Sequence, residues 1–114
     1  LPMLNGELVS TGKVPSQVSI EDAQSAARQC VLNGLAVLKA ELGGSFDRLV
    51  RLVRIGAFVQ SDDDFSAQPQ VANGASELLL EILGDQGRHA RAAVGVNALP
   101  LNVPVEIEFL FEVD

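Results

Sequence analysis

The chain has no tryptophan or tyrosine, and only one cysteine, one methionine and one histidine among its 114 residues. Without Trp or Tyr, few side chains could stack on the bases of a single-stranded nucleic acid. The single Cys30 excludes an internal disulfide, which is typical of a protein from a reducing compartment. Cys30 could serve as a nucleophile, but no basic group lies near it in the sequence. The pattern favours a small apolar residue of a helix.

Basic residues are also scarce, because 8 Lys and Arg stand against 15 Asp and Glu and leave a net charge of −7. Nucleic-acid binding normally needs a basic stripe, since phosphate contacts supply most of the affinity. Here the only basic cluster is Arg48, Arg51 and Arg54, so we expect no nucleic-acid partner. No apolar run is long enough to cross a membrane, and no basic-then-apolar leader opens the chain. We expect a soluble, cytoplasmic protein without membrane contact.

Aliphatic residues dominate what is present, with 47% hydrophobic but only 4% aromatic residues. This length and composition predict one domain, residues 1–114, with an aliphatic core. No phosphate-binding glycine loop, nucleophile elbow or cysteine pair at metal spacing occurs. The consecutive Asp62, Asp63 and Asp64 would diverge in direction, which favours a solvated turn over a metal site. We expect neither a metal nor an organic cofactor.

The periodicity predicts alternating strands and helices. A tight turn at Asn5-Gly6 indicates a hairpin, and Ser19 with Asp22 indicates the start of a helix that ends at Gly43. The next elements are a strand over 49–59, a helix over 69–83, and strands over 89–97 and 105–113. Each helix has one apolar stripe and must cover one face of an antiparallel or mixed sheet, so we predict an α+β fold. The strand over 49–59 is nearly all apolar and should be central, with both faces covered.

The last two strands each alternate apolar and polar residues. The alternation predicts a charged face that carries Arg91 and Glu106. A guanidinium beside small residues leaves room for a planar anion. If the two strands form a hairpin, Glu106 lies several residues along the sheet from Arg91. The two side chains would then meet only across a subunit boundary.

These residues carry a resemblance to a known family. The segments Gly87-Arg88-His89-Ala90-Arg91, Leu99-Pro100 and Val105-Glu106-Ile107-Glu108 resemble the Rid (YjgF-like) family of enamine/imine deaminases. The resemblance implies a chorismate-mutase-like mixed sheet with two helices on one face, assembled as a homotrimer with clefts at its interfaces. It also implies that the chain begins inside the fold, without the first part of the N-terminal strand.

The resemblance also implies roles for single residues. Arg91 would bind the carboxylate of a 2-imino or 2-amino-enoic acid such as 2-aminoacrylate, and Glu106 would position the attacking water. Asn73 and the backbone of Ala93 would contribute to substrate binding. The products would be a 2-keto acid and ammonia. The expected partners are therefore a small carboxylate-bearing metabolite and further copies of the chain.

Several alternatives remain open from the residues themselves. Arg91 could instead form a structural salt bridge with Glu106, Glu108 or Glu112, and Glu106 could merely balance its charge. His89 could act as a general base, although a positional or surface role is favoured. The same cleft could bind a small carboxylate without turnover, as a regulatory module. A ribonuclease or translation inhibitor is a further alternative, which the acidic charge disfavours.

Overall fold

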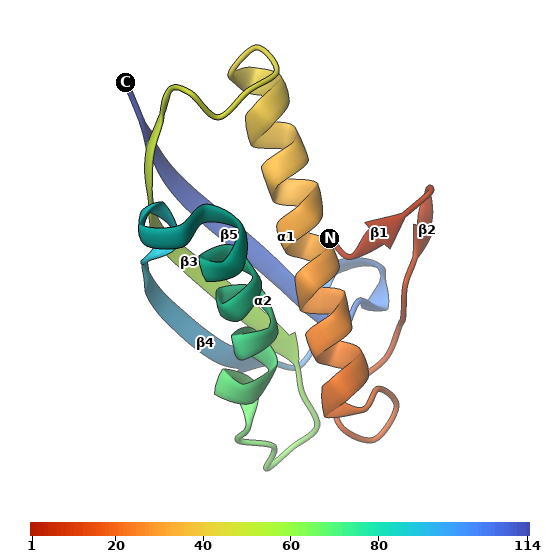
Figure 1. The fold of residues 1–114 in the computed structure, drawn as a ribbon. Coiled ribbons are helices and arrows are strands. Elements are labelled where there is room, and N and C mark those ends of the chain that lie inside the picture. The colour runs from red at the N-terminus through yellow and green to blue at the C-terminus, as the bar shows by residue number, and fades with distance from the viewer.

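Two helices pack on one face of a three-stranded mixed sheet in the computed structural model, which describes residues 1–114 (Figure 1). The helices are α1 (Ile20–Glu41), which contacts β5, and α2 (Gln68–Leu83), which contacts β4. The sheet contains β4 (Ala90–Val96), β3 (Leu49–Gln60) and β5 (Val105–Val113) in that order. This arrangement confirms the predicted α+β fold. Neither helix combines the length and apolarity that crossing a bilayer requires.

The local turn and capping motifs act where the sequence predicts them. Asn5 and Gly6 have φ values of 54° and 81° and join β1 (Met3–Leu4) to β2 (Glu7–Leu8). The Ser19 side chain accepts a hydrogen bond of 3.1 Å from the Asp22 backbone N–H and so caps α1. After α1, Gly43 takes a φ of 82°, a conformation that glycine adopts without steric cost.

The core lies between the helices and the inner face of the sheet. Strand β3 is its centre, because it pairs with both other strands and its Leu52, Ile55 and Val59 are fully buried. The helices contribute small and branched side chains, which allow them to approach the sheet closely. The fully buried helix residues are Ala23, Ala26, Ala27, Val31, Val71, Ala72, Ala75 and Leu79.

The predicted hairpin of the last two strands is wrong. Strand β4 pairs parallel to β3, and β5 pairs antiparallel to the other edge of β3, so β3 separates them. The reason is that α2 forms the crossover from β3 to β4, and such a crossover makes parallel neighbours. The chain then crosses the end of β3 through the short helix η2 (Pro100–Asn102) before it enters β5.

The expectation that both faces of β3 are covered is also wrong within this chain. The helices cover one face, while Arg51 and Arg54 are exposed on the strand. Arg51 pairs with Glu112 on β5 at 2.9 Å, and Arg54 pairs with Glu108 at 3.3 Å. The sheet therefore has one apolar inner face and one outer face that carries ion pairs.

Asp62, two residues after the end of β3, binds the loop that precedes α1. Its carboxylate accepts a hydrogen bond of 2.8 Å from the Ser16 backbone N–H, and hydrogen bonding from Ser16 lowers the pKa of Asp62. Because the pKa of Asp62 is lower in the folded than in the unfolded protein, its charged carboxylate stabilises the fold at pH values above the pKa of the unfolded chain. This stabilisation is lost as pH falls through the pKa of the folded protein.

We therefore expect stability to decline more steeply with acidification in the wild type than in Asp62→Asn. Urea unfolding midpoints measured between about pH 6 and pH 3 test this, since this is the range in which a carboxyl group takes up its proton. Asp63→Asn, at the exposed neighbouring position, is the matched control and should keep the wild-type slope. Parallel curves for the wild type and Asp62→Asn would contradict the prediction.

Candidate functional site

Arg91 stands on the edge strand β4 and faces the helices. It pairs in register with Ile55, which is fully buried on the inner face of the sheet. Paired residues of neighbouring strands share a face, so the Arg91 side chain extends toward α2. Because β4 is at the sheet edge, the guanidinium ends at the surface and is exposed.

The first turns of α2 hold this guanidinium. Arg91 Nη1 donates hydrogen bonds to Asn73 Oδ1 at 2.9 Å and to Ser76 Oγ at 3.1 Å. Arg91 Nη2 donates to the Pro69 carbonyl at 3.4 Å. A guanidinium has five N–H donors, so the Nε–H and one Nη2–H have no partner within the protein. Nε and Nη2 form one edge of the group, and that edge fits the two oxygens of a carboxylate.

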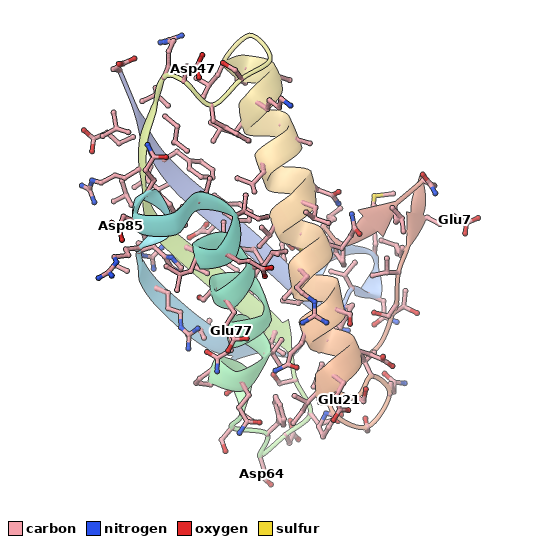
Figure 2. The ribbon with its side chains drawn as sticks, viewed as in Figure 1. Glu7, Glu21, Asp47, Asp64, Glu77 and Asp85 are labelled. Atoms are coloured by element: carbon pink, nitrogen blue, oxygen red, sulfur yellow. The ribbon has the colours of Figure 1, made fainter.

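A surface cavity opens beside this group. It has a volume of about 350 Å³ and is lined by Arg91, Arg88, His89, Ser76 and Leu80. No carboxylate lines it. Figure 2 shows two acidic residues of this region, Glu77 on α2 and Asp85 in the turn that follows it. The Asp85 carboxylate pairs with Arg88 Nε at 3.3 Å and balances the charge of Arg88. The cavity therefore presents the unpaired positive charge of Arg91 and a hydroxyl group, which suits a small anion.

His89 is more closely held than a surface residue would be. It is half-buried; its Nε2 lies 2.9 Å from Ser76 Oγ, and its Nδ1 is hydrogen-bonded to the Gly87 carbonyl. Ser76 was not among the site residues predicted from the sequence. A usable indication was present, because Ser76 follows Asn73 by one helical turn and residues at that spacing share a helix face.

The two secondary candidates lie near Arg91. Asn73 is a direct hydrogen-bond partner of the guanidinium. Ala93 follows on the same face of β4 and packs against the core. The outer edge of β4 has no partner strand, so the strand is free to offer backbone groups there.

Glu106 does not share this site within one chain, and the prediction of one charged face that carries both residues is wrong. Glu106 pairs in register with Phe58, which alternates along β3 with the buried Ala57 and Val59. Glu106 therefore lies on the outer face of the sheet, while Arg91 lies on the inner face. The alternation within each strand was visible in the sequence, but not which set of residues faces the helices.

The proposed structural salt bridges of Arg91 are also absent. Glu108 and Glu112 pair with Arg54 and Arg51 on the outer face, and none of the four ion pairs includes Arg91 or Glu106. Both of these charges are thus without an ionic partner in the isolated chain, and each is available to a ligand or to another subunit.

Cys30 lies on the inner face of α1 and is buried. Burial raises the pKa of its thiol to about 11, so the group stays protonated at neutral pH and is a poor nucleophile. This agrees with its interpretation as a small core residue.

An inner face covered by two helices and an electropositive cavity at the sheet edge define a chorismate-mutase-like α+β protein. The family described as "YjgF/chorismate mutase-like, putative endoribonuclease" matches residues 1–113. The chain therefore belongs to the YjgF/chorismate-mutase-like family.

Individual relatives agree with this assignment. Protein TCP17 of Trypanosoma cruzi is 42% identical over 105 residues, which cover 91% of this chain and 65% of that protein. The chain thus spans slightly less than two thirds of the length of this relative. A protein named as a putative regulator, AldR, from Lactococcus lactis is 28% identical over 97% of this chain and 82% of its own length.

Two crystal structures share the fold. The protein Atu1372 of Agrobacterium tumefaciens, described as of unknown function, superposes with a TM-score of 0.97 at 44% identity, over 99% of this chain and 72% of that one. A protein of Shewanella oneidensis described as a putative endoribonuclease superposes with a TM-score of 0.92 at 29% identity, over 98% and 74%. These neighbours support the fold and family rather than one activity.

Proposed function

We propose that this protein hydrolyses reactive enamines and imines of 2-amino acids, such as 2-aminoacrylate, to 2-keto acids and ammonia. The observation that carries the proposal is the free Nε/Nη2 edge of Arg91 in a cavity without carboxylates. That edge matches the carboxylate that every such substrate has beside its C=N carbon. Asn73 Oδ1 holds the guanidinium from the α2 side, and we assign a second contact with the ligand to the backbone at Ala93, two residues further along β4.

The chemistry requires water and one group that handles its proton. An enamine first becomes the imine by moving a proton from its nitrogen to C3. The water oxygen then bonds to the C=N carbon while a carboxylate accepts a proton from it and passes that proton to the imine nitrogen. In the resulting carbinolamine the hydroxyl proton passes through the same carboxylate to the amino nitrogen, the C–N bond breaks, ammonia leaves and the carbonyl forms. We assign the carboxylate to Glu106, and a positioned general base of this kind contributes about 100-fold to 10,000-fold.

The opposite faces of Arg91 and Glu106 require the site to be completed by a second chain. We propose a homotrimer in which Arg91 of one subunit and Glu106 of its neighbour border one cleft. The unpaired outer edges of β4 and β5 and the outer face of the sheet are the surfaces that such an assembly would cover.

An assay coupled to a pyridoxal-dependent dehydratase, which generates the enamine, tests the activity. The protein should accelerate keto-acid formation, and Glu106→Gln should slow it about 100-fold while carboxylate binding persists. Glu108→Gln, the next carboxylate on the same face, is the control and should remain near the wild-type rate.

Mixing Arg91→Ala with Glu106→Gln then tests the shared cleft. After subunit exchange, about a quarter of the interfaces should combine the intact Arg91 of one subunit with the intact Glu106 of another. Activity above that of either variant alone is expected. A mixture that stays as inactive as its components would contradict the proposed subunit boundary.

A non-catalytic carboxylate-binding regulator is the second candidate, favoured by the similarity to AldR, which is named as a putative regulator. Calorimetry with 2-ketobutyrate distinguishes the two. Binding that depends on Arg91 without any acceleration of imine decay would establish the regulator instead. The endoribonuclease description of the family is tested separately, because RNA cleavage that survives Arg91→Ala would place that activity elsewhere on the protein.

A further inference from the structure

We propose that Ser76 and His89 are positioning residues that hold Arg91 in its carboxylate-binding orientation. His89 orients the Ser76 hydroxyl, and Ser76 in turn holds Arg91. The inference rests on the proposed role of Arg91, and it assigns a function to two residues that lie between α2 and β4. Both are half-buried, and both line the same cavity as Arg91.

The hydrogen-bond directions follow from the chemistry of the partners. The Gly87 carbonyl can only accept, so His89 Nδ1 must carry the proton that it shares with that oxygen. In the neutral imidazole, Nε2 is then an acceptor, and the Ser76 hydroxyl donates its proton to Nε2 across 2.9 Å. The short turn that contains Gly87 thus selects the tautomer of His89.

Arg91 has no acceptor, so the Ser76 oxygen accepts a hydrogen bond from Arg91 Nη1 across 3.1 Å. The bond to His89 fixes where the hydroxyl hydrogen points and so holds the lone pairs of this oxygen in one orientation toward Arg91. A serine inside a helix otherwise tends to donate to the carbonyl one turn earlier. His89 removes that competing arrangement, and Asn73 Oδ1 supplies the second acceptor for the same nitrogen.

Both Nη1 hydrogens of Arg91 are therefore bonded to side chains of α2. Rotation about the Cζ–Nε bond would break these bonds, so the Nε/Nη2 edge stays directed away from α2. Holding this edge in advance lowers the entropic cost of binding a carboxylate. Loss of either positioning residue should therefore weaken binding without removing the charge.

NMR of the free protein tests the arrangement independently of any catalysis. Nitrogen-15 shifts at pH 8 should show His89 protonated on Nδ1 and bare on Nε2. The Nη1 and Nη2 signals of Arg91 should be resolved at low temperature in the wild type and in Ser76→Thr, which keeps the hydroxyl. They should merge through faster rotation in Ser76→Ala and His89→Phe. A dominant Nε2–H tautomer, or equal rotation in all four proteins, would overturn the proposal.

Calorimetry with 2-ketobutyrate measures the effect on the site. Ser76→Ala and His89→Phe should each weaken binding about fivefold to tenfold. The double variant should be no weaker than Ser76→Ala alone, because His89 acts through Ser76. In an Arg91→Ala background, neither substitution should change the remaining affinity, whereas additive effects there would show a merely structural role. If the wild type does not bind 2-ketobutyrate, the proposed function fails, while the NMR result still decides the positioning roles.

Discussion

Arg91→Ala should lower kcat/KM for imine hydrolysis by about 100-fold or more, which corresponds to a loss of about 3 kcal/mol of transition-state stabilisation. The guanidinium is the cavity's source of a two-point contact with a carboxylate, since its Nε–H and one Nη2–H have no partner in the protein. Its removal also leaves Asn73 and Ser76 facing an empty space. The dehydratase-coupled assay measures the rate, and calorimetry with 2-ketobutyrate measures the binding component.

Two further variants separate charge from geometry. Arg91→Lys keeps the charge but offers a point-like ammonium that cannot form the paired contact, so we expect it to remain at least about tenfold below the wild type. Arg28→Ala removes an exposed arginine of α1, whose guanidinium bonds only to Ser25, and should leave activity unchanged. Equal rates for the wild type and Arg91→Ala would refute the proposed mechanism.

Gly74→Ala should destabilise the fold by up to about 2 kcal/mol, although alanine is intrinsically the better helix former. A Cβ at Gly74 would lie 2.7 Å from the Gln24 carbonyl oxygen and 3.0 Å from Gln24 Cα. These are backbone atoms of α1, so relief requires the two helices to separate. Overpacking of this kind costs about 1–3 kcal/mol, and the gain in helix propensity, about 1 kcal/mol, offsets only part of it.

Gly34→Ala is the matched control on α1. Its Cβ would also meet an atom at 2.7 Å, but that atom is Cε2 of the half-buried Phe109 ring. Phe109 borders an apolar groove of about 410 Å³ between α1 and β5, into which the ring can turn. We expect Gly34→Ala to be neutral or slightly stabilising in urea unfolding. A Gly74→Ala variant as stable as Gly34→Ala would show that the helix crossing adapts at little cost.

Most of the local structure could be predicted from the sequence because its causes are local. The Asn5-Gly6 turn, the Ser19 cap and the glycine after α1 depend on neighbouring residues, and all three act as predicted. The apolar stripe of α2 was also largely correct. Val71, Ala75 and Leu79 of this stripe are buried, whereas Ile82 is 44% exposed and the neighbouring Leu83 packs against the core in its place.

The site was predictable only in part. The pattern in β4 singled out Arg91, and Asn73, for which the resemblance implied only a role in substrate binding, accepts a hydrogen bond from its guanidinium. Ser76 was missed because a serine in a helix has no distinctive pattern, and its importance comes from its contact with His89 on another element. Glu106 was predicted to share a face with Arg91, which is wrong. Alternation of residues within a strand does not show which of its two faces packs against the helices, and the face that carries Arg91 in β4 packs against them while the face that carries Glu106 in β5 does not.

The sequence by itself therefore determined the elements, their order, the α+β class and the position of Arg91 on a strand near the end of the chain. Periodicity and capping are properties of short segments, and the chain reports them directly. Only the tertiary structure decided that β4 and β5 lie on opposite edges of the central β3 instead of side by side. The register of each pair with β3 then places Arg91 and Glu106 on opposite faces. Strand order depends on which hydrophobic faces α1 and α2 can bury together, and that is a competition among long-range contacts that no single segment records.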